Sequence, residues 1–334
     1  MSLESSTVST SLEDIRAKLA GTKLSASTMN FIVWIDDPAR RDWIRERAGM
    51  LSRKHPSFTL VLDHSGTRGG DATVTTTQHD DSPVPYTVLG ESVEIDVDDA
   101  DAQTIAGYVT GLCPSGLPTV LWWSGAREES RPIFEALLPL TDTLVFDSSG
   151  GTADETTFRR VAEFHASKPD VFMRDLAWLR LRPWQDLIAN FFDDPNLAGE
   201  LFSIRRLQIT SGSDAEAFYL AGWLASRLDW TATARDTFTD RAHNTITFDR
   251  RREGEMRRVR SICLDSETSW YHGEVSGDAE SVVSVWVEGE HAREPRLFPL
   301  QAIDNASLLE RAILEAGCDE LFETALRSAA TLLG

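Results

Sequence analysis

The 334-residue sequence is poor in cysteine and has no long apolar run. Its three cysteines, Cys113, Cys263 and Cys318, are too few and too widely spaced for a secreted disulfide framework or a thiolate metal site. The longest apolar runs, such as residues 117–123, are far shorter than the roughly 20 residues that span a bilayer. The N-terminal segment has neither the basic nor the apolar region of a secretion signal. We therefore expect a cytoplasmic protein.

Basic residues are also scarce relative to acidic ones. The chain has 33 Lys and Arg against 53 Asp and Glu, which gives a net charge of −20. Such a chain would repel a phosphate backbone instead of releasing its counterions. Nucleic acid and anionic membranes are therefore not expected partners. The hydrophobic content of 41% is ample for two packed cores, so we expect two domains.

The sequence signatures of nucleotide binding, catalysis and metal binding are missing. No expected strand is followed by G-x-G-x-x-G or G-x-x-x-x-G-K-[ST], and G-x-S-x-G does not occur. The seven histidines never take the i, i+4 spacing of a zinc site. The acidic run at residues 96–101 departs from a calcium loop, because Asp101 replaces the needed glycine and Gly107 the bidentate glutamate. We predict no catalytic residue, no cofactor and no metal site, although a triad assembled from distant residues stays open.

What the first half does contain is a regular alternation of strand and helix patterns. The expected strands are residues 29–36, 58–63, 92–97, 117–123 and 143–147. The expected helices are residues 12–20, 38–54, 102–112, 131–140 and a last one opened by a capping box at Thr152 and Glu155. Residues 64–85 are expected to form a loop or a weak edge hairpin. Near-continuous apolar strands separated by helices indicate a mostly parallel, Rossmann-like sheet covered on both faces.

The second half has a different pattern, with consecutive strands. A helix beginning at Pro183 is followed by an expected strand at residues 204–209 and a helix headed by a capping box at Ser213 and Glu216. Four period-two segments then follow without intervening helices, which indicates an antiparallel sheet in an α+β domain. The expected organisation is a leader and short helix at residues 1–24, an α/β domain at 25–170, a connecting segment with a bridging helix at 171–203, and an α+β domain at 204–334.

A turn of small residues gives the best candidate for a ligand site. Ser148, Ser149 and Gly150 follow the last expected strand of the first domain. Small residues at the carboxyl end of a strand can hold an anion on their N–H and hydroxyl groups. An ordinary strand-to-helix turn is the alternative.

Arginine and tryptophan gather at two places. In WLRLRPW, the side chains of Trp178, Arg180 and Arg182 share one face if the segment is extended. Six arginines fall within residues 250–260, in an expected hairpin: Arg250, Arg251, Arg252, Arg257, Arg258 and Arg260. Either group could dock on an acidic partner, because Arg and Trp are enriched at binding hot spots. Intramolecular ion pairing is the alternative for both.

The segments LPTVLWWSG, TDTLVFDSS, DLAWLRLRPW and DELFETALRSA together resemble the OpcA family, the glucose-6-phosphate dehydrogenase assembly proteins. The resemblance implies a non-catalytic protein that binds glucose-6-phosphate dehydrogenase, favours its active oligomer and raises its activity. It therefore implies a role in the oxidative pentose phosphate pathway and in NADPH supply. Thioredoxin-linked control is associated with cyanobacterial members, but no cysteine here matches a regulatory one. A second hypothesis is an enzyme or sensor that binds a sugar phosphate or nucleotide in the α/β domain.

Overall fold

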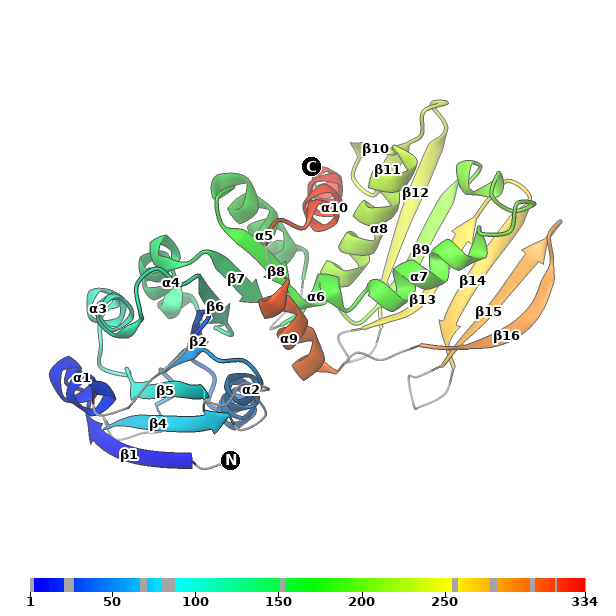
Figure 1. The fold of residues 1–334 in the computed structure, drawn as a ribbon. Helices are drawn as coiled ribbons and strands as arrows, with labels where there is room; N and C mark the ends of the chain where they lie inside the picture. Colours follow the sequence, from blue (N-terminus) through cyan, green and yellow to red (C-terminus); the bar gives the residue numbers. More distant parts are fainter. Residues whose placement is uncertain are drawn as a thin grey trace. The chain divides into compact units, whose positions relative to one another are not determined.

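The computed structural model describes residues 3–20, 27–66, 71–79, 88–125, 127–150, 154–253, 258–276, 282–300, 304–315 and 317–333. Contacts divide the chain into two compact units (Figure 1). The first consists of Met1–Phe146 with Asp170–Arg174, and the second of Asp147–Pro169 with Asp175–Gly334. Among the described residues, no helix is long and apolar enough to cross a membrane.

The first unit is built on an eight-stranded sheet. In order across the sheet, the strands are β1 (Leu3–Ser9), β4 (Asp71–His79), β5 (Val88–Asp96), β3 (Phe58–Asp63), β2 (Asn30–Ile35), β6 (Thr119–Trp123), β7 (Thr143–Phe146) and β8 (Phe172–Asp175). The five strands β5, β3, β2, β6 and β7 are parallel. The chain adds strands first on one side of β2 and then, with β6, on the other. The topological switch point, where ligands bind in open α/β sheets, therefore lies between β2 and β6.

Helices cover both faces of this sheet. They are α1 (Leu12–Ala20), α2 (Arg41–Lys54), α3 (Ala102–Leu112) and α4 (Arg131–Leu137), with short 3-10 turns at Glu128–Ser130 and Leu138–Leu140. Figure 1 shows α3 and α4 on one face and α2 on the other. All residues of β2 and β3 are buried, as their mainly apolar sequences predict. The expected mostly parallel, Rossmann-like sheet is thus confirmed.

The edge of this sheet differs from the sequence expectation. Residues 3–9, which the sequence pattern assigns to a leader, form β1, and β1 pairs antiparallel with β4. Strand β4 in turn pairs antiparallel with β5, so the described part of residues 64–85 contributes a strand between β1 and β5 and not one at the edge of the sheet. The β-branched threonines of β4 suit a pleated strand. Because these threonines are polar, a search for apolar patterns does not predict this strand.

The second unit is built on another eight-stranded sheet, whose neighbouring strands are antiparallel except for β12 and β9. In order across the sheet, the strands are β10 (Thr231–Ala234), β11 (Thr237–Thr239), β12 (Thr245–Arg252), β9 (Arg206–Ser211), β13 (Val259–Asp265), β14 (Ser269–Val275), β15 (Val282–Gly289) and β16 (Arg293–Pro299). The mainly antiparallel sheet is confirmed. The expected hairpin over residues 250–260 is wrong, because β9 inserts between β12 and β13.

One face of this second sheet is covered by helices. The helices of the unit are α5 (Glu155–Ser167), α6 (Leu176–Leu179), α7 (Arg182–Phe191), α8 (Asp214–Leu228), α9 (Asn305–Leu314) and α10 (Glu320–Ala330), with 3-10 turns at Glu200–Phe202 and Thr331–Leu333. Figure 1 shows α7 and α8 lying across the sheet. Tyr271 of β14 contacts the rings of Phe191 and Phe192, and Phe248 of β12 contacts Phe218 of α8. These aromatic contacts form the core of the unit.

Helix α5 belongs with the second unit by its contacts. The ring centroid of Phe158 lies 4.9 Å from those of Phe218 and Tyr219 on α8. The contacts therefore divide the chain after Phe146, earlier than the boundary expected at residue 170. The carboxylate of Asp154 caps α5 by accepting from the backbone N–H of Thr157 (2.9 Å), while Thr152 lies outside the described residues.

The packing of α8 against α10 requires a glycine. A Cβ at Gly222 would lie 2.1 Å from the carbonyl oxygen of Ala325 and 2.8 Å from the Cβ of Ala329. We expect Gly222→Ala to lower the free energy of unfolding by about 1–3 kcal/mol, because the helices must separate. The matched control is Gly107→Ala in α3, where an added Cβ meets nothing within 4 Å. This control should gain about 0.5–1 kcal/mol from helix propensity. Equal urea-unfolding curves for the two variants would contradict the prediction.

Candidate functional site

Acidic and hydroxyl side chains occupy the switch point of the first unit. Asp36 follows β2 and is fully buried. Its Oδ2 accepts from the Oγ of Ser130 (2.8 Å). Ser124 follows β6, and its hydroxyl donates to the carbonyl of Trp34. The sequence between β2 and α2 is Asp-Asp-Pro-Ala-Arg, in place of a glycine-rich turn. Two carboxylates and a proline without an N–H oppose the approach of a pyrophosphate to this helix N-terminus.

Aromatic rings pack beside the switch point. Trp34 is fully buried and stacks on Trp123 at a centroid distance of 5.3 Å and on His64 at 5.4 Å. The ring of Trp123 also contacts Phe134 edge-on at 4.9 Å. A Cβ at Gly125 would lie 2.8 Å from both the Trp123 ring and the Asp36 carboxylate. The chain's own side chains therefore crowd this strand-end region.

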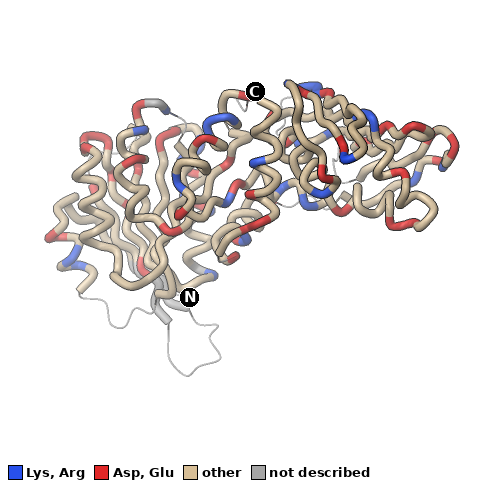
Figure 2. The backbone as a smooth tube through the Cα atoms, turned by 90° about the horizontal axis from the view of Figure 1, so that it is seen from above, with Lys and Arg blue, Asp and Glu red and all other residues tan. Residues whose placement is uncertain are grey.

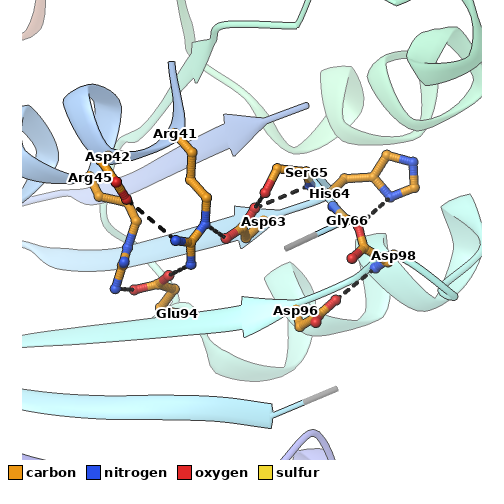
Figure 3. Close-up of polar contacts among 10 residues, drawn as sticks. All are labelled: Arg41, Asp42, Arg45, Asp63, His64, Ser65, Gly66, Glu94, Asp96 and Asp98. Carbon is orange, nitrogen blue, oxygen red and sulfur yellow. Dashed lines mark hydrogen bonds and ion pairs between the residues drawn. The ribbon is translucent and has the colours of Figure 1, made fainter. Parts of the chain in front are cut away.

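The carboxylate at the end of β3 is engaged in an internal ion pair (Figure 3). Asp63 is 2% exposed, and its Oδ2 accepts from the Nε of Arg41 at 2.5 Å. Its Oδ1 accepts from the hydroxyl of Ser65 at 2.6 Å. Arg41 and Arg45 also pair with Glu94, at 3.5 and 2.6 Å. In dinucleotide-binding folds, an acid near this position holds the ribose hydroxyls. Here that carboxylate is already bonded on both oxygens.

Burial, neighbouring charges and hydrogen bonds together shift the pKa values of Arg41 and Asp98. Although burial lowers the pKa of Arg41, the carboxylates of Asp63 and Glu94 raise it above its ordinary value. Partial burial and the Asp96 carboxylate raise the pKa of Asp98, against the N–H of Gly66, which donates to it at 2.9 Å (Figure 3). Within the described ranges, no group of three or more His, Cys, Asp or Glu is placed to hold a metal ion.

The predicted anion turn lies inside a buried polar cluster of the second unit. Ser148 and Ser149 are 2% and 0% exposed. The backbone N–H of Ser148 donates to Oδ1 of Asp175 (3.0 Å), and that of Gly150 to the carbonyl of Asp147 (3.0 Å). The Oγ of Ser149 donates to Oδ1 of Asp147 at 2.5 Å. These N–H and hydroxyl donors of the turn are therefore bonded to carboxylates and to a backbone carbonyl of the chain itself.

Arg180 is the cation at the centre of this cluster. Its side chain is 11% exposed and pairs with Asp147 at 3.0 Å and with Glu216 at 2.8 Å. Although burial lowers the pKa of Arg180, these two carboxylates raise it well above its ordinary value. Burial raises the pKa of Glu216 to about 8, and the guanidinium opposes that shift. The Glu216 side chain thus bonds Arg180. The expected capping box of Ser213 and Glu216 does not form, because the Ser213 side chain makes no capping hydrogen bond.

The WLRLRPW segment is helical and not extended. Oδ1 of Asp175 accepts from the N–H of Ala177 at 2.9 Å and so caps α6. Trp178 is 6% exposed, and its indole N–H donates to Asp319 at 3.0 Å. Because Trp178 and Arg180 are both buried in intramolecular contacts, neither is a candidate for a partner surface.

Asp175 and Tyr219 are part of the cluster that sequence reasoning missed. Asp175 is fully buried, and its Oδ2 accepts from the hydroxyl of Tyr219 at 2.7 Å. Burial and the nearby Asp147 carboxylate raise the pKa of Asp175 to about 6. Burial and Asp175 raise the pKa of Tyr219. An aspartate before an apolar helix signals a cap, but nothing in the local pattern reveals its complete burial.

The remaining arginines differ in their surroundings. Arg182 is 52% exposed and pairs with Asp186 one turn along α7. Arg250 is mostly buried over the ring of Phe218 and pairs with Glu155 (3.3 Å), Asp214 and Asp236. Four others gather near the end of β9, with Arg251 and Arg252 exposed on β12 and Arg258 and Arg260 partly exposed at the start of β13. Arg257 lies outside the described residues.

Comparisons with known proteins cover both units. A family model for the N-terminal domain of the glucose-6-phosphate dehydrogenase subunit matches residues 48–163. Another, for the C-terminal domain of the same protein, matches residues 172–326. Together they match most of the chain.

Two cyanobacterial relatives are each named putative OxPP cycle protein OpcA. The protein from Synechocystis sp. is 35% identical over 131 residues, which are 39% of this chain and 27% of that protein. The protein from Synechococcus elongatus is 32% identical over 142 residues, which are 42% of this chain and 32% of that protein. The matches thus span about a third or less of these relatives' length.

Among solved structures, the chain is similar to KijD10, a 3-ketoreductase from Actinomadura kijaniata, in complex with NADP and TDP-benzene. The TM-score is 0.49 at 13% identity, over 91% of this chain and 95% of that one. It is also similar to the transcriptional regulator Gal80p from Kluyveromyces lactis, with a TM-score of 0.46 at 8% identity, over 88% and 84% of the two chains. Because domain models of one family match both units, the chain belongs to the OpcA family of glucose-6-phosphate dehydrogenase subunit proteins.

Proposed function

We propose that the chain is a non-catalytic subunit that binds glucose-6-phosphate dehydrogenase, favours its active oligomer and raises its activity. The family descriptions support the partner, since both matched regions are named as subunit domains of this enzyme. The names of the relatives support a place in the oxidative pentose phosphate pathway. We further propose a cytoplasmic location, which fits three free cysteines in a reducing compartment.

The observation that carries the non-catalytic part is the occupied strand-end region of the first unit. A dehydrogenase of this fold would place a pyrophosphate at the N-terminus of α2 and a ribose on the acid that ends β3. Here the turn before α2 contains Asp36 and Asp37, and Asp63 is bonded to Arg41 and Ser65. A bound dinucleotide would have to overcome the repulsion between its pyrophosphate and the two aspartates before α2. It would also have to break the buried ion pair of Asp63 with Arg41 at the end of β3.

The second hypothesis, a sugar-phosphate or nucleotide sensor, gains less support. A phosphate at Ser148 and Ser149 would meet the carboxylates of Asp147 and Asp175 and would have to draw Arg180 from its ion pairs. A thermal-shift assay separates the two hypotheses, because a ligand specific for the folded chain raises its melting temperature. We expect no shift with glucose 6-phosphate, 6-phosphogluconate or NADP. A saturable shift with any of them would favour the sensor.

The direct test is co-elution with the cognate dehydrogenase on a sizing column, with activity assayed in the same fractions. We expect a complex, a larger dehydrogenase oligomer and higher activity than for the dehydrogenase alone. The chain by itself should not reduce NADP with glucose 6-phosphate. Failure of the two proteins to co-elute or to show stimulation under any substrate condition would overturn the proposal.

Arginines of the second unit are candidates for the contact with the partner. We expect Arg251→Glu combined with Arg258→Glu, and separately Arg182→Glu, to weaken binding and reduce its salt dependence, because screened charge pairs are lost. The expected loss is about 2 kcal/mol for a desolvated contact and below about 1 kcal/mol for an exposed rim. Arg241→Glu is the matched control, at a side chain 79% exposed and paired with Asp229. If the control weakens binding as much as the test variants, the effect is not local to these arginines.

We predict that the cysteines do not make activation redox-sensitive, so a thioredoxin link is not part of the proposal. Burial raises the pKa of Cys113 to about 12 and also raises that of Cys263. A hydrogen bond to Glu323 raises the pKa of Cys318 to about 11. Few thiolates therefore exist at neutral pH. Stimulation of the dehydrogenase should be the same with and without dithiothreitol, for the parent and for a variant with all three cysteines changed to serine. A response to reductant that the triple variant loses would disprove this prediction.

A further inference from the structure

Helix α2 is basic on a chain that is otherwise acidic. It contains four arginines and one lysine against two acidic residues, and Arg40 precedes it. Figure 2 shows acidic residues recurring along the backbone, with basic residues interspersed among them. Two of the arginines, Arg41 and Arg45, are neutralised by Asp63 and Glu94. These two ion pairs do not account for the other basic residues of α2 and for Arg40.

A second face of α2 carries a row of side chains that we call the α2 stripe: Arg40, Trp43, Arg47 and Met50. Their spacing of three and four residues places them along one side of the helix. The guanidinium carbons of Arg40 and Arg47 lie 5.5 and 5.7 Å from the centroid of the Trp43 ring. Nη1 of Arg47 lies 3.2 Å from the sulfur of Met50, which is 37% exposed. The stripe is thus one continuous set of contacts.

Trp43, the tryptophan of the stripe, packs against the core of the first unit. Its ring meets that of Trp122 on β6 edge-on, at a centroid distance of 6.1 Å. Trp43 itself is only partly buried, so part of the ring remains available to a partner. An aromatic side chain fixed against the core loses little conformational entropy on binding.

The cations of the stripe lack strong partners among the residues that the structure describes. Over the described ranges, Arg40 forms no ion pair and is partly exposed. The carboxylate paired with Arg47 is that of the neighbouring, well-exposed Glu46, at 3.8 Å. Exposed pairs of this kind contribute little. The Nε of Arg47 is buried without a hydrogen-bond partner among the described residues. The stripe therefore presents positive charge that the described part of the chain does not neutralise.

We propose that the α2 stripe is a docking surface for a carboxylate-bearing surface of the partner dehydrogenase, and this inference rests on the proposed function. Tryptophan, arginine and methionine are the residue types enriched at protein interfaces, and Trp and Arg dominate their hot spots. The unneutralised guanidinium groups select an acidic partner surface. The stripe belongs to the first unit, so it would contribute separately from the arginines of the second.

The test measures the affinity of the full chain for the cognate dehydrogenase at low and moderate salt. We expect Arg40→Glu combined with Arg47→Glu to weaken binding about 10-fold or more, mostly through slower association. The control is Arg131→Glu, a charge reversal in the same unit at a side chain 69% exposed. It should change the affinity less than about 2-fold. Arg40→Gln, a milder change at a partly exposed position, keeps the test valid if the double variant does not fold.

The outcomes are distinct. Wild-type affinity in folded stripe variants, while the parent binds, overturns the stripe and leaves the proposed function standing. An equal loss in the Arg131→Glu control also overturns the stripe, because the effect is then one of total charge. Failure of the parent chain to bind the dehydrogenase overturns both.

Discussion

Replacing Arg180 with alanine is expected to lower the free energy of unfolding by about 3–5 kcal/mol at neutral pH. The substitution removes the guanidinium from between Asp147 and Glu216, the latter 1% exposed. Asp147 and the fully buried Glu216 then both lose the guanidinium that they bond, and their carboxyl oxygens are left without this partner in a desolvated site. Urea unfolding of the full chain measures the loss.

Arg182→Ala is the matched control for this prediction, two residues away. Its side chain is 52% exposed and pairs with Asp186 at 3.4 Å. Loss of such a pair should change stability by less than about 0.5 kcal/mol. If Arg180→Ala instead leaves stability unchanged and weakens binding to the dehydrogenase, Arg180 belongs to the interface and the buried-cluster interpretation is wrong.

The stability of an Asp175→Asn variant relative to the parent is expected to increase as pH rises. The folded pKa of about 6 lies above the ordinary value of 3.8, chiefly because the carboxyl group is buried. The folded state therefore holds this proton more tightly than the unfolded state. The stability that results is complete below pH 3.8 and is lost as pH rises through 6. A shift of this size corresponds to about 3 kcal/mol.

An asparagine side chain cannot ionise, so the variant escapes that loss. Its unfolding free energy relative to the parent should rise by about 2 kcal/mol between about pH 4.5 and 7.5. Burial, the largest cause of the high pKa of Glu216, is the same in parent and variant, whereas the smaller contribution of the Asp175 charge is lost in the variant. Asp101→Asn gives a control of opposite sign, because hydrogen bonds from Thr104 lower the pKa of Asp101. A difference between Asp175→Asn and the parent that is independent of pH would contradict the prediction.

Sequence patterns predicted the two sheets because their strands carry the strongest signals. The buried strands β2 and β3 are mainly apolar, and β13 to β15 follow one another without helices. The position of β9 between β12 and β13 was not predictable in the same way. Pairing between strands far apart in sequence depends on the whole sheet, and a short connection between β12 and β13 suggested a hairpin instead.

The polar clusters were predicted only in part. The Ser148 turn and Arg180 stood out in the sequence as separate features, whereas the structure unites them with Asp175, Glu216 and Tyr219. These side chains come from several segments, so no local spacing links them. The arginine-rich α2 gave no comparable signal, because its cations alternate between an internal face and the α2 stripe and form no dense run.

The interleaving of the two units in sequence affects how either could be produced alone. Strand β8 comes from residues 172–175, which follow α5, yet most of it belongs with the first unit. A polypeptide ending at Phe146 would lack β8 and would leave β7, at the edge of a mostly buried parallel sheet, with unpaired backbone groups. Such an edge is a template for association with other chains. Neither unit therefore corresponds to one continuous stretch of the sequence. To produce the first unit alone, residues 170–174 would have to be fused to residues 1–146.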